Sequence, residues 1–536
     1  MKNRILSFLI ISFHFFFLNF IYSQDPGSLD LSFNGSGYNE TDFGISSKII
    51  GLGVQDDGKI IACGMSYSDV YNIALARYLP NGSLDLSFGS SGLGYLSHAF
   101  GASDETVTDM VLQGDGKILI SGYTQALGSY LSNSFVARFN TDGTFDPSFS
   151  SDGIQIVDNS DFDQANSICL MDDGKILLYG TGNNDGGNSN LVVNRLHSNG
   201  QLDTGFGNSG MVNIDVSDNS YDYGEGIAVA NGNIYIAGLS YADTDHIVVL
   251  CLHSTGQINS DFGEEGIVSF DMELYNVVLY NGTDLIITQD NKIAVSAFRN
   301  PGTAVDFVLI KVLMNGFPDE DFGIHGVVIT DMIGDNKPFS ILEQTNGDIL
   351  LGGYHEDNVN GLDFTLARYL DNGDLDATFG NHYGVTWHNL SANVSNPKDV
   401  VYAMDMQEDG KIIAAGYAMG ADYQNFTIAR YYSGLEVGVH SQESTSEPSI
   451  YYNAQSSTIN IKYNLHMAQE EIQVTVFDLS GRKMDVKKLH ENSRGHYTLH
   501  LRNDVYLIPG VYLIRVQHGS QSFSKKLMVM SSHSAY

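Results

Sequence analysis

The segment Leu84-Asp85-Leu86-Ser87-Phe88-Gly89 is one copy of a short motif that occurs seven times along the chain. The copies begin at Leu29, Leu84, Phe145, Leu202, Ile258, Pro318 and Leu375. The second residue of each copy is Asp or Asn, and these residues lie 55, 61, 57, 56, 60 and 57 positions apart. A repeat of this period, built from short strands, predicts a β-propeller or a related array.

A tight turn follows each motif. The turns are Asp57-Gly58, Asp115-Gly116, Asp173-Gly174, Asn231-Gly232, Asp290-Asn291, Asn346-Gly347 and Asp409-Gly410. Such pairs supply the positive φ angles that hairpin turns need. The strand after each turn is almost continuously apolar, as in Lys117–Gly122, which indicates a strand covered on both faces. The following strand often ends in Arg and an aromatic residue, as in Arg138-Phe139.

These counts predict an all-β seven-bladed β-propeller over residues 25–432, because no helical period of apolar residues occurs between 25 and 448. The region begins with a motif and one strand, at 37–43, and ends on the strand 426–431. The first strand is therefore expected to complete the last blade and close the ring, which removes exposed sheet edges. Strictly sequential blades are the alternative.

Three further segments flank or follow the repeats. Residues 1–23 read as a signal peptide, because Lys2 and Arg4 precede an apolar run that ends near Ser23. A membrane anchor is the alternative reading of that run. Residues 433–448 are rich in Ser and Glu and read as a linker. Residues 449–536 contain about six alternating strands, which predict a small C-terminal β-sandwich.

Both repeat region and C-terminal region resemble known families. The Leu-Asp-x-Ser-Phe-Gly motif, the Asp-Gly-Lys-Ile turn and the Ala-Arg-Tyr strand resemble the delta-60 repeat family, a group of predicted propellers in secreted and surface bacterial proteins. Residues 449–536 are similar to the type A C-terminal sorting domain of the type IX secretion system of Bacteroidetes, through 476–482, 507–516 and 525–529. The resemblance implies export to the medium or the outer cell surface, with the type IX machinery as partner. It implies no particular activity.

Charge and cysteine content narrow the choice of partners. Residues 449–536 carry a net charge of +4 and the first 23 residues carry +2. Because the whole chain has a net charge of −36, the repeat region and linker together carry −42. Such a surface repels nucleic acid and anionic membranes. Cys63, Cys169 and Cys251 have no paired spacing and are expected to be buried free thiols. No membrane span is expected after signal cleavage.

No residue is predicted to be catalytic, cofactor-binding or metal-binding. The repeated Asp of the motif recurs once per blade, so we expect it to accept backbone N–H groups in a turn and to pair with the repeated Arg. One face is expected to be acidic, through Asp104, Glu105, Asp158, Asp161, Asp163, Asp218, Asp222 and Asp335. We interpret these as solvated loop residues; a calcium ion held by their oxygens is the alternative. His355-Glu356-Asp357 lacks a second His at ligand spacing, and Trp387 is expected to pack.

The sequence thus predicts a secreted or cell-surface propeller that acts as a binding or adhesion scaffold for an extracellular glycan or protein. Because no catalytic motif is found, the protein is predicted not to be an enzyme. Two alternatives stay open at this point. One is a propeller enzyme that acts on extracellular polysaccharide, which would need two converging carboxyl groups. The other is a structural surface component without a discrete ligand.

Overall fold

The chain divides into two compact units, residues 1–436 and 437–536. The computed structural model describes residues 25–99, 103–183, 187–216, 221–241, 245–271, 284–299, 304–357, 361–391, 394, 397–435, 449–453, 458–465, 470–478, 482–491, 495–502, 510–518 and 521–529. The predicted signal peptide and most of the predicted linker lie outside these residues. No helix occurs among the described residues, which confirms the all-β class. Within them there is accordingly no helix that could span a membrane.

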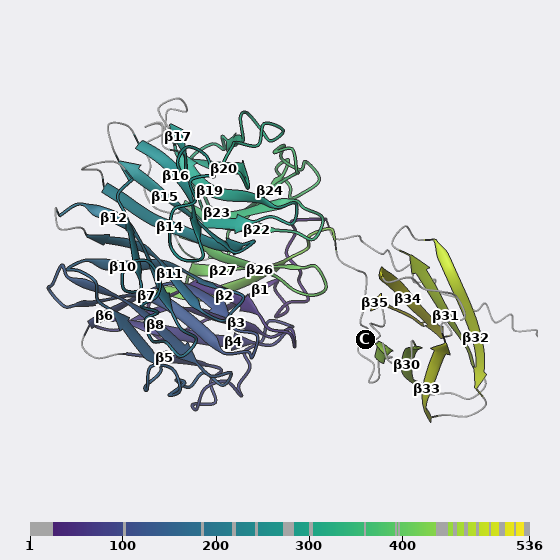
Figure 1. The fold of residues 1–536 in the computed structure, drawn as a ribbon. Coiled ribbons are helices and arrows are strands. Elements are labelled where there is room, and N and C mark those ends of the chain that lie inside the picture. Colours follow the sequence, from purple (N-terminus) through teal and green to yellow (C-terminus); the bar gives the residue numbers. More distant parts are fainter. Residues whose placement is uncertain are drawn as a thin grey trace, which may run out of the picture. The chain divides into compact units, whose positions relative to one another are not determined.

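Four-stranded antiparallel sheets make up the first unit, and within its described residues there are seven of them (Figure 1). Sheet 1 contains β2 (Ser47–Val54), β3 (Ile60–Tyr67), β4 (Tyr71–Tyr78) and β5 (Tyr95–His98). Sheet 2 contains β6 (Ser103–Leu112), β7 (Ile118–Ala126), β8 (Ser132–Phe139) and β9 (Ile154–Val157). Sheet 3 contains β10 (Asp163–Leu170), β11 (Ile176–Asn183), β12 (Ser189–Leu196) and β13 (Met211–Ile214).

The remaining four sheets follow the same order. Sheet 4 contains β14 (Tyr221–Ala230), β15 (Asn233–Tyr241), β16 (Asp245–His253) and β17 (Ile267–Asp271). Sheet 5 contains β18 (Asp284–Ile287), β19 (Lys292–Arg299), β20 (Asp306–Leu313) and β21 (Val327–Thr330). Sheet 6 contains β22 (Asp335–Glu343), β23 (Ile349–Asp357), β24 (Gly361–Tyr369) and β25 (Val385–His388). Sheet 7 contains β26 (Val400–Met406), β27 (Ile412–Met419), β28 (Gln424–Tyr431) and, as its outer strand, β1 (Tyr38–Thr41).

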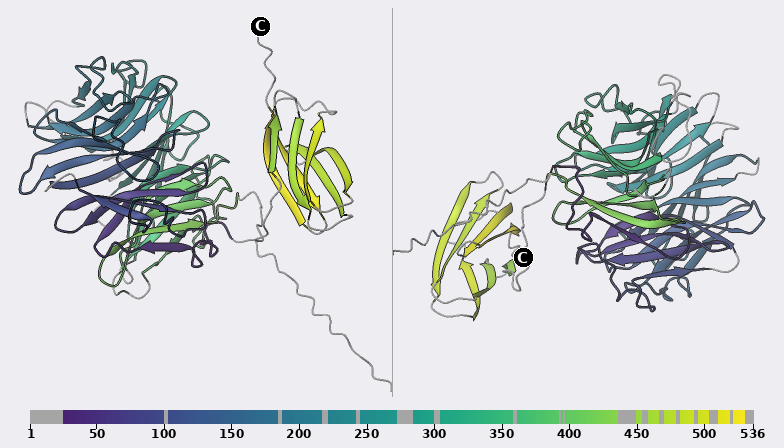
Figure 2. Two further views of the ribbon diagram at one scale, coloured as in Figure 1. Left: turned by 90° about the horizontal axis from the view of Figure 1, so that it is seen from below. Right: turned by 180° about the vertical axis from the view of Figure 1, so that it is seen from behind.

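Burial of apolar side chains between neighbouring sheets holds the first unit together. The middle strands are buried on both faces, as the continuous apolar runs predict; all eight residues of β12 are buried, for example. One hydrophobic cluster joins each sheet to the next, from sheets 1 and 2 around to sheets 7 and 1. Figure 2 shows the same sheets from two further sides. This arrangement of mutually packed sheets is that of a β-propeller.

The pairing of β1 with β28 is the one that the sequence predicts. Its register runs from Tyr38 opposite Ala429 to Thr41 opposite Phe426. The preceding residues continue the contact, because the Asp30 N–H donates to the Arg430 carbonyl over 2.8 Å. β1 also reaches sheet 1, where the Thr41 and Tyr78 hydroxyls lie 2.8 Å apart. The N-terminal strand thus connects the last sheet with the first.

Successive strands alternate in direction, so each sheet has two distinct ends. One end is called the loop end here. It holds the connection that enters the first strand and the connection that joins the second strand to the third. The other end holds the Asp-Gly hairpins and the repeated motifs and is called the motif end. At the motif end Gly116 has a φ of 81°, and Asn291 of the divergent hairpin has a φ of 55°. Both turns therefore use the left-handed region, as the sequence predicts.

The second unit contains two antiparallel sheets in its described residues. One has the order β29 (Ser449–Asn453), β30 (Thr458–Leu465), β33 (Gly495–Arg502). The other has the order β32 (Lys483–Glu491), β31 (Glu470–Asp478), β34 (Gly510–His518), β35 (Gln521–Val529). Val474 and Ile514 are buried side chains of the second sheet. The alternating segments of the sequence thus form strands.

Candidate functional site

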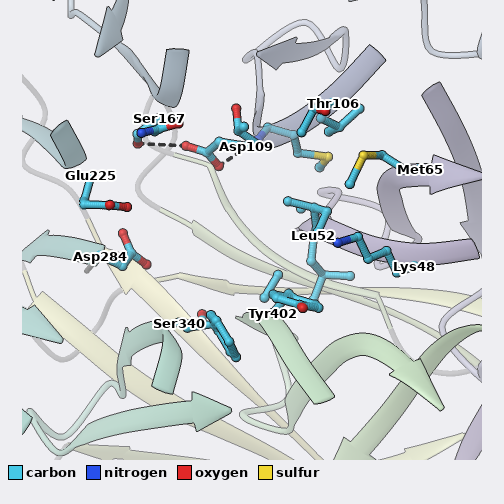
Figure 3. Close-up of a pocket in the computed structure, with 18 of the residues that line it drawn as sticks. Lys48, Leu52, Met65, Thr106, Asp109, Ser167, Glu225, Asp284, Ser340 and Tyr402 are labelled. Carbon is cyan, nitrogen blue, oxygen red and sulfur yellow. Dashed lines mark hydrogen bonds between the residues drawn. The ribbon is translucent and has the colours of Figure 1, made fainter. Parts of the chain in front are cut away.

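A cavity of about 520 Å³ lies between the first strands of the seven sheets. Residues of β2, β6, β10, β14, β18, β22 and β26 line it. Figure 3 shows that its polar side chains point inward from several of these strands. A cavity of this size, at the point where all sheets converge, can hold a small molecule or one unit of a polymer.

A β-bulge shapes the wall in the first strands of sheets 1, 2, 3, 4, 6 and 7. In each of these strands one residue has no partner in the ladder to the second strand. The extra residues are Ile50, Thr108, Asn166, Glu225, Phe339 and Tyr402, and all of them line the cavity. A bulge redirects a side chain. Because the same bulge occurs in six sheets, six different side chains face the cavity.

Three carboxyl groups, on Asp109, Glu225 and Asp284, form what is here called the carboxyl wall. Burial raises the pKa of Asp109 to about 6, although Ile168 N–H, Met110 N–H and the Ser167 hydroxyl donate hydrogen bonds to it. Burial, together with the charge of Asp109, raises the pKa of Asp284 to about 7. Burial raises the pKa of Glu225 to about 8, against the attraction of Lys337. The wall is therefore partly protonated near neutral pH, with Glu225 the most protonated and Asp109 the least.

The opposite side, here called the aromatic wall, consists of Phe339, Tyr402 and Lys48. The two rings lie 4.7 Å apart between centroids, and Lys48 Nζ lies 5.4 Å from the centre of the Tyr402 ring. In Figure 3 the Lys48 amino group points into the cavity from the side opposite Asp284 and Glu225. Leu52, Met65 and Met404 complete this side with apolar atoms. The cavity thus has one polar and one largely apolar side.

The carboxyl wall should reduce the stability of the fold. The pKa of Asp284 is higher in the folded than in the unfolded chain, so the unfolded chain binds fewer protons between about pH 4 and pH 7, and stability falls as the pH rises through this range. We expect Asp284→Asn to increase the free energy of unfolding at pH 8 by about 1–3 kcal/mol, with almost no gain at pH 4. Urea unfolding at both pH values measures this. The exposed Asp161→Asn serves as the control, and an equal gain at pH 4 and pH 8 would contradict the assignment.

The repeated Asp and Arg residues lie away from the cavity, at the motif end. The predicted pairing is observed between Nε and a carboxylate oxygen in Arg77–Asp85 (2.9 Å), Arg138–Asp146 (2.8 Å), Arg195–Asp203 (2.9 Å), Arg368–Asp376 (2.9 Å) and Arg430–Asp30 (2.9 Å). In sheet 4 the corresponding residues are Cys251 and Asn259, whose side chains lie 3.6 Å apart. These contacts connect strands and turns.

The predicted acidic face consists partly of residues that hold backbone turns. Asp163 accepts the N–H of Asn159 over 2.7 Å, and Asp222 accepts that of Val216 over 2.8 Å. Asp218 lies outside the described residues. Among the residues that the structure describes, no group of three or more His, Cys, Asp or Glu side chains is placed to hold a metal ion. Solvated loops stay the prediction for these residues, and calcium binding stays the alternative to it.

The other features that the sequence singled out pack inside sheets. The buried His355 ring stacks on Trp387 at 4.5 Å, and the Trp387 ring also stacks on His382 at 3.5 Å. The three cysteines are free thiols, two of them buried and Cys169 partly exposed. Sequence reasoning named none of the cavity residues.

The comparisons with known proteins agree with this architecture. The family model described as "Domain of unknown function (DUF5122) beta-propeller" matches residues 55–88, 113–149, 172–206, 344–379 and 407–433. A second model, "Secretion system C-terminal sorting domain", matches residues 449–530. The protein is therefore an exported β-propeller protein. Its repeats are of the delta-60 type and its C-terminal region is a type IX sorting domain, which places it in the medium or on the outer cell surface.

Several solved structures are similar to the chain at low identity. A polysaccharide lyase of family 25, an ulvan lyase, is 10% identical, with 74% of this chain and 96% of that chain covered and a TM-score of 0.43. A mutant sialidase of Trypanosoma rangeli that displays trans-sialidase activity is 10% identical, with coverages of 90% and 83% and a TM-score of 0.35. An α-L-arabinofuranosidase of Clostridium thermocellum is 11% identical, with coverages of 56% and 92% and a TM-score of 0.26. No curated protein matches the chain.

These structures correct one expectation. The sequence analysis predicted that the protein is not an enzyme, and that exclusion is wrong, because the similar solved structures are themselves carbohydrate-active enzymes. The absence of a local catalytic motif carries little weight in a propeller, where distant strands assemble the site. At these identities no substrate and no residue role passes from those proteins to this chain.

Proposed function

We propose that the protein is a cell-surface scaffold that binds an extracellular polysaccharide in the central cavity of a closed seven-bladed propeller. In this proposal residues 1–23 are the signal peptide, 25–432 the propeller and 433–448 a linker. Residues 449–536 form a β-sandwich that the type IX secretion machinery recognises. The sheets and the inter-sheet clusters described above support the blade number and the closure.

The division of the cavity into two walls carries the proposal. A sugar ring has C–H groups on its faces and hydroxyl groups around its edge. The rings of Phe339 and Tyr402 offer an apolar surface to such a face. Asp109, Glu225 and Asp284, partly protonated near neutral pH, can both donate to and accept from hydroxyl groups. A ligand of this amphipathic shape satisfies both walls at once.

Cleavage of the bound polysaccharide is a second candidate function, and Glu225 favours it. A general acid must be protonated at the working pH, and burial raises the pKa of Glu225 to about 8. Asp284 lies beside it in the cavity wall (Figure 3), and its pKa of about 7 leaves part of it ionised. Two carboxyl groups whose pKa values differ suit acid and base roles.

The test is binding of the secreted chain to laminarin, xylan, chitosan and alginate, measured by calorimetry. We expect Glu225→Gln and Tyr402→Ala to weaken binding of the preferred polymer by about tenfold or more, equivalent to about 1.4 kcal/mol. The matched control is Glu408→Gln, an exposed Glu in a hairpin at the motif end, which should leave binding unchanged. If no polymer binds, or if neither cavity variant alters binding, the proposal is wrong. Release of shorter sugars by the native chain but not by Glu225→Gln would establish cleavage.

A further inference from the structure

Exposed tyrosines gather at the loop end of three consecutive sheets. Tyr67 and Tyr71 flank the connection between β3 and β4, Tyr130 lies between β7 and β8, and Tyr423 lies between β27 and β28. These are the same kind of connection in sheets 1, 2 and 7. Tyr130 is 90% exposed. The set Tyr67, Tyr71, Tyr130 and Tyr423 is called the tyrosine arc here.

The three sheets that carry the arc are neighbours in the order of the sheets. One buried cluster contains Phe426 of sheet 7 and Ala74 of sheet 1, and another contains Ile73 of sheet 1 and Phe135 of sheet 2. The backbone N–H of Tyr71 also donates to Asp104 of sheet 2 over 2.9 Å, which holds the loop of sheet 1 against the next sheet.

A buried tyrosine, Tyr417, links the aromatic wall to the strand that leads to one member of the arc. Tyr402 lies 6.1 Å between ring centroids from Tyr417 of β27, and β27 leads into the connection that carries Tyr423. Tyr67 and Tyr71 have centroids 4.9 Å apart and planes inclined at 55°, so they form a two-ring platform. The amide of Asn72 donates to Ser68 Oγ and to the Val70 carbonyl, both over 3.3 Å, and these bonds order the loop. An ordered platform loses little entropy on binding.

The opposite end of the propeller has a different pattern. Several of its exposed apolar side chains, such as Leu31, Leu86 and Ile258, occupy positions within the repeated motif. They recur with the fold and need no ligand to explain them. The arc instead occupies positions where the repeats differ, which is where function concentrates in repeat folds. Exposed Asp69 and Asp422 lie beside its tyrosines, so a dry apolar protein contact is a poor match.

We propose that a polysaccharide chain extends from the cavity across sheets 7, 1 and 2 and stacks its sugar rings on the tyrosine arc. The ligand is accordingly a chain of several sugar units rather than a single sugar. Tyrosine suits this role because its ring packs on C–H faces while its hydroxyl group stays in water. This inference rests on the proposed function, since the cavity is where the chain begins.

Fragments of two to ten units, prepared from the best-binding polymer among laminarin, xylan, chitosan and alginate, test the inference. Calorimetry on the full secreted chain should show affinity that rises with fragment length. Tyr130→Ala, Tyr423→Ala and the double variant Tyr67→Ala/Tyr71→Ala should each lower the affinity for the longest fragment by roughly five- to tenfold and leave that of the two-unit fragment unchanged. Tyr383→Ala, at an exposed tyrosine of the motif end, should change neither affinity.

The outcomes separate this inference from the proposed function. Equal affinities for short and long fragments, with Tyr402→Ala still weakening both, would overturn the arc and leave the cavity in place. Unchanged affinity for long fragments in all arc variants would also overturn it. If no fragment binds to the native chain, both the inference and the proposed function fail.

Discussion

A chain that lacks residues 25–45 should not form a stable monomeric propeller. The deletion removes β1, the fourth strand of sheet 7, and leaves the backbone groups of β28 unpaired along one edge. It also removes Asp30, a fully buried carboxylate that accepts hydrogen bonds from Arg430 Nε and from the Tyr432 hydroxyl over 2.9 and 2.7 Å. Arg430 would then be a buried charge without its main partner, and an open edge favours aggregation.

We expect the deletion to reduce the free energy of unfolding by more than about 5 kcal/mol, which is comparable to the whole stability of many domains. Size-exclusion chromatography and thermal unfolding of chains that start at residue 25 or at residue 46 measure the effect. A peptide of residues 25–45 supplied separately should restore the monomer, because it can add the missing strand, whereas a scrambled peptide should not. A shortened chain that stays monomeric with an unchanged Tm would show that β1 does not close the ring.

The architecture could be predicted because each repeat contains its own local signals. Asp115-Gly116 marks a turn by its conformational preference alone, and Lys117–Gly122 marks a strand that is buried on both faces. The pairing of Arg138 with Asp146 could also be expected, since both recur at fixed distances. The closing strand followed from the order of motifs, because the first motif has no blade of its own before it.

The cavity could not be predicted, because no single repeat contains it. Seven first strands contribute to it, and the bulges that turn Glu225 and Tyr402 inward appear only in the pairing register. One signal was available. Asp109, Glu225 and Asp284 stand six residues before the first residue of the hairpin turn of their repeats, where the other four repeats have Gly, Ser or Ala. A carboxyl group at a position that is otherwise small is a break in symmetry, which is a reasonable guide to function in repeat proteins.

The motif-end ion pairs explain why the repeat retains both Arg and Asp, and they lead to the second large effect. Arg138 donates from Nη1 to the Ser198 carbonyl over 2.6 Å, so it also connects sheet 2 to the connection that follows β12 in sheet 3. Its guanidinium group lies 4.7 Å from the centre of the Phe149 ring. Burial opposes ionisation of Asp146, but hydrogen bonds from Ser148 and the charges of Lys117 and Arg138 outweigh it and lower its pKa.

Arg138→Ala should therefore destabilise the propeller by about 3 kcal/mol, because it leaves the Asp146 carboxylate buried with only Lys117, whose Nζ lies 3.2 Å away, as a cationic partner. The folded chain keeps Asp146 ionised to a lower pH than the unfolded chain, so this contribution is present above about pH 4 and is lost as the pH falls further. The difference between native and variant chains in urea unfolding should shrink accordingly from pH 7 to pH 3.

Sheet 4 supplies the matched variant. There Cys251 and Asn259 occupy the Arg and Asp positions without any charge, so Arg138→Cys combined with Asp146→Asn should cost less than Arg138→Ala alone. Lys175→Ala breaks an exposed pair with Asp173 at another hairpin and should cost less than about 1 kcal/mol. If Arg138→Ala had the same urea midpoint as the native chain, or if the double variant were the less stable one, the ion pair would not be what holds neighbouring sheets together at this end. The repeated charges would then need another explanation.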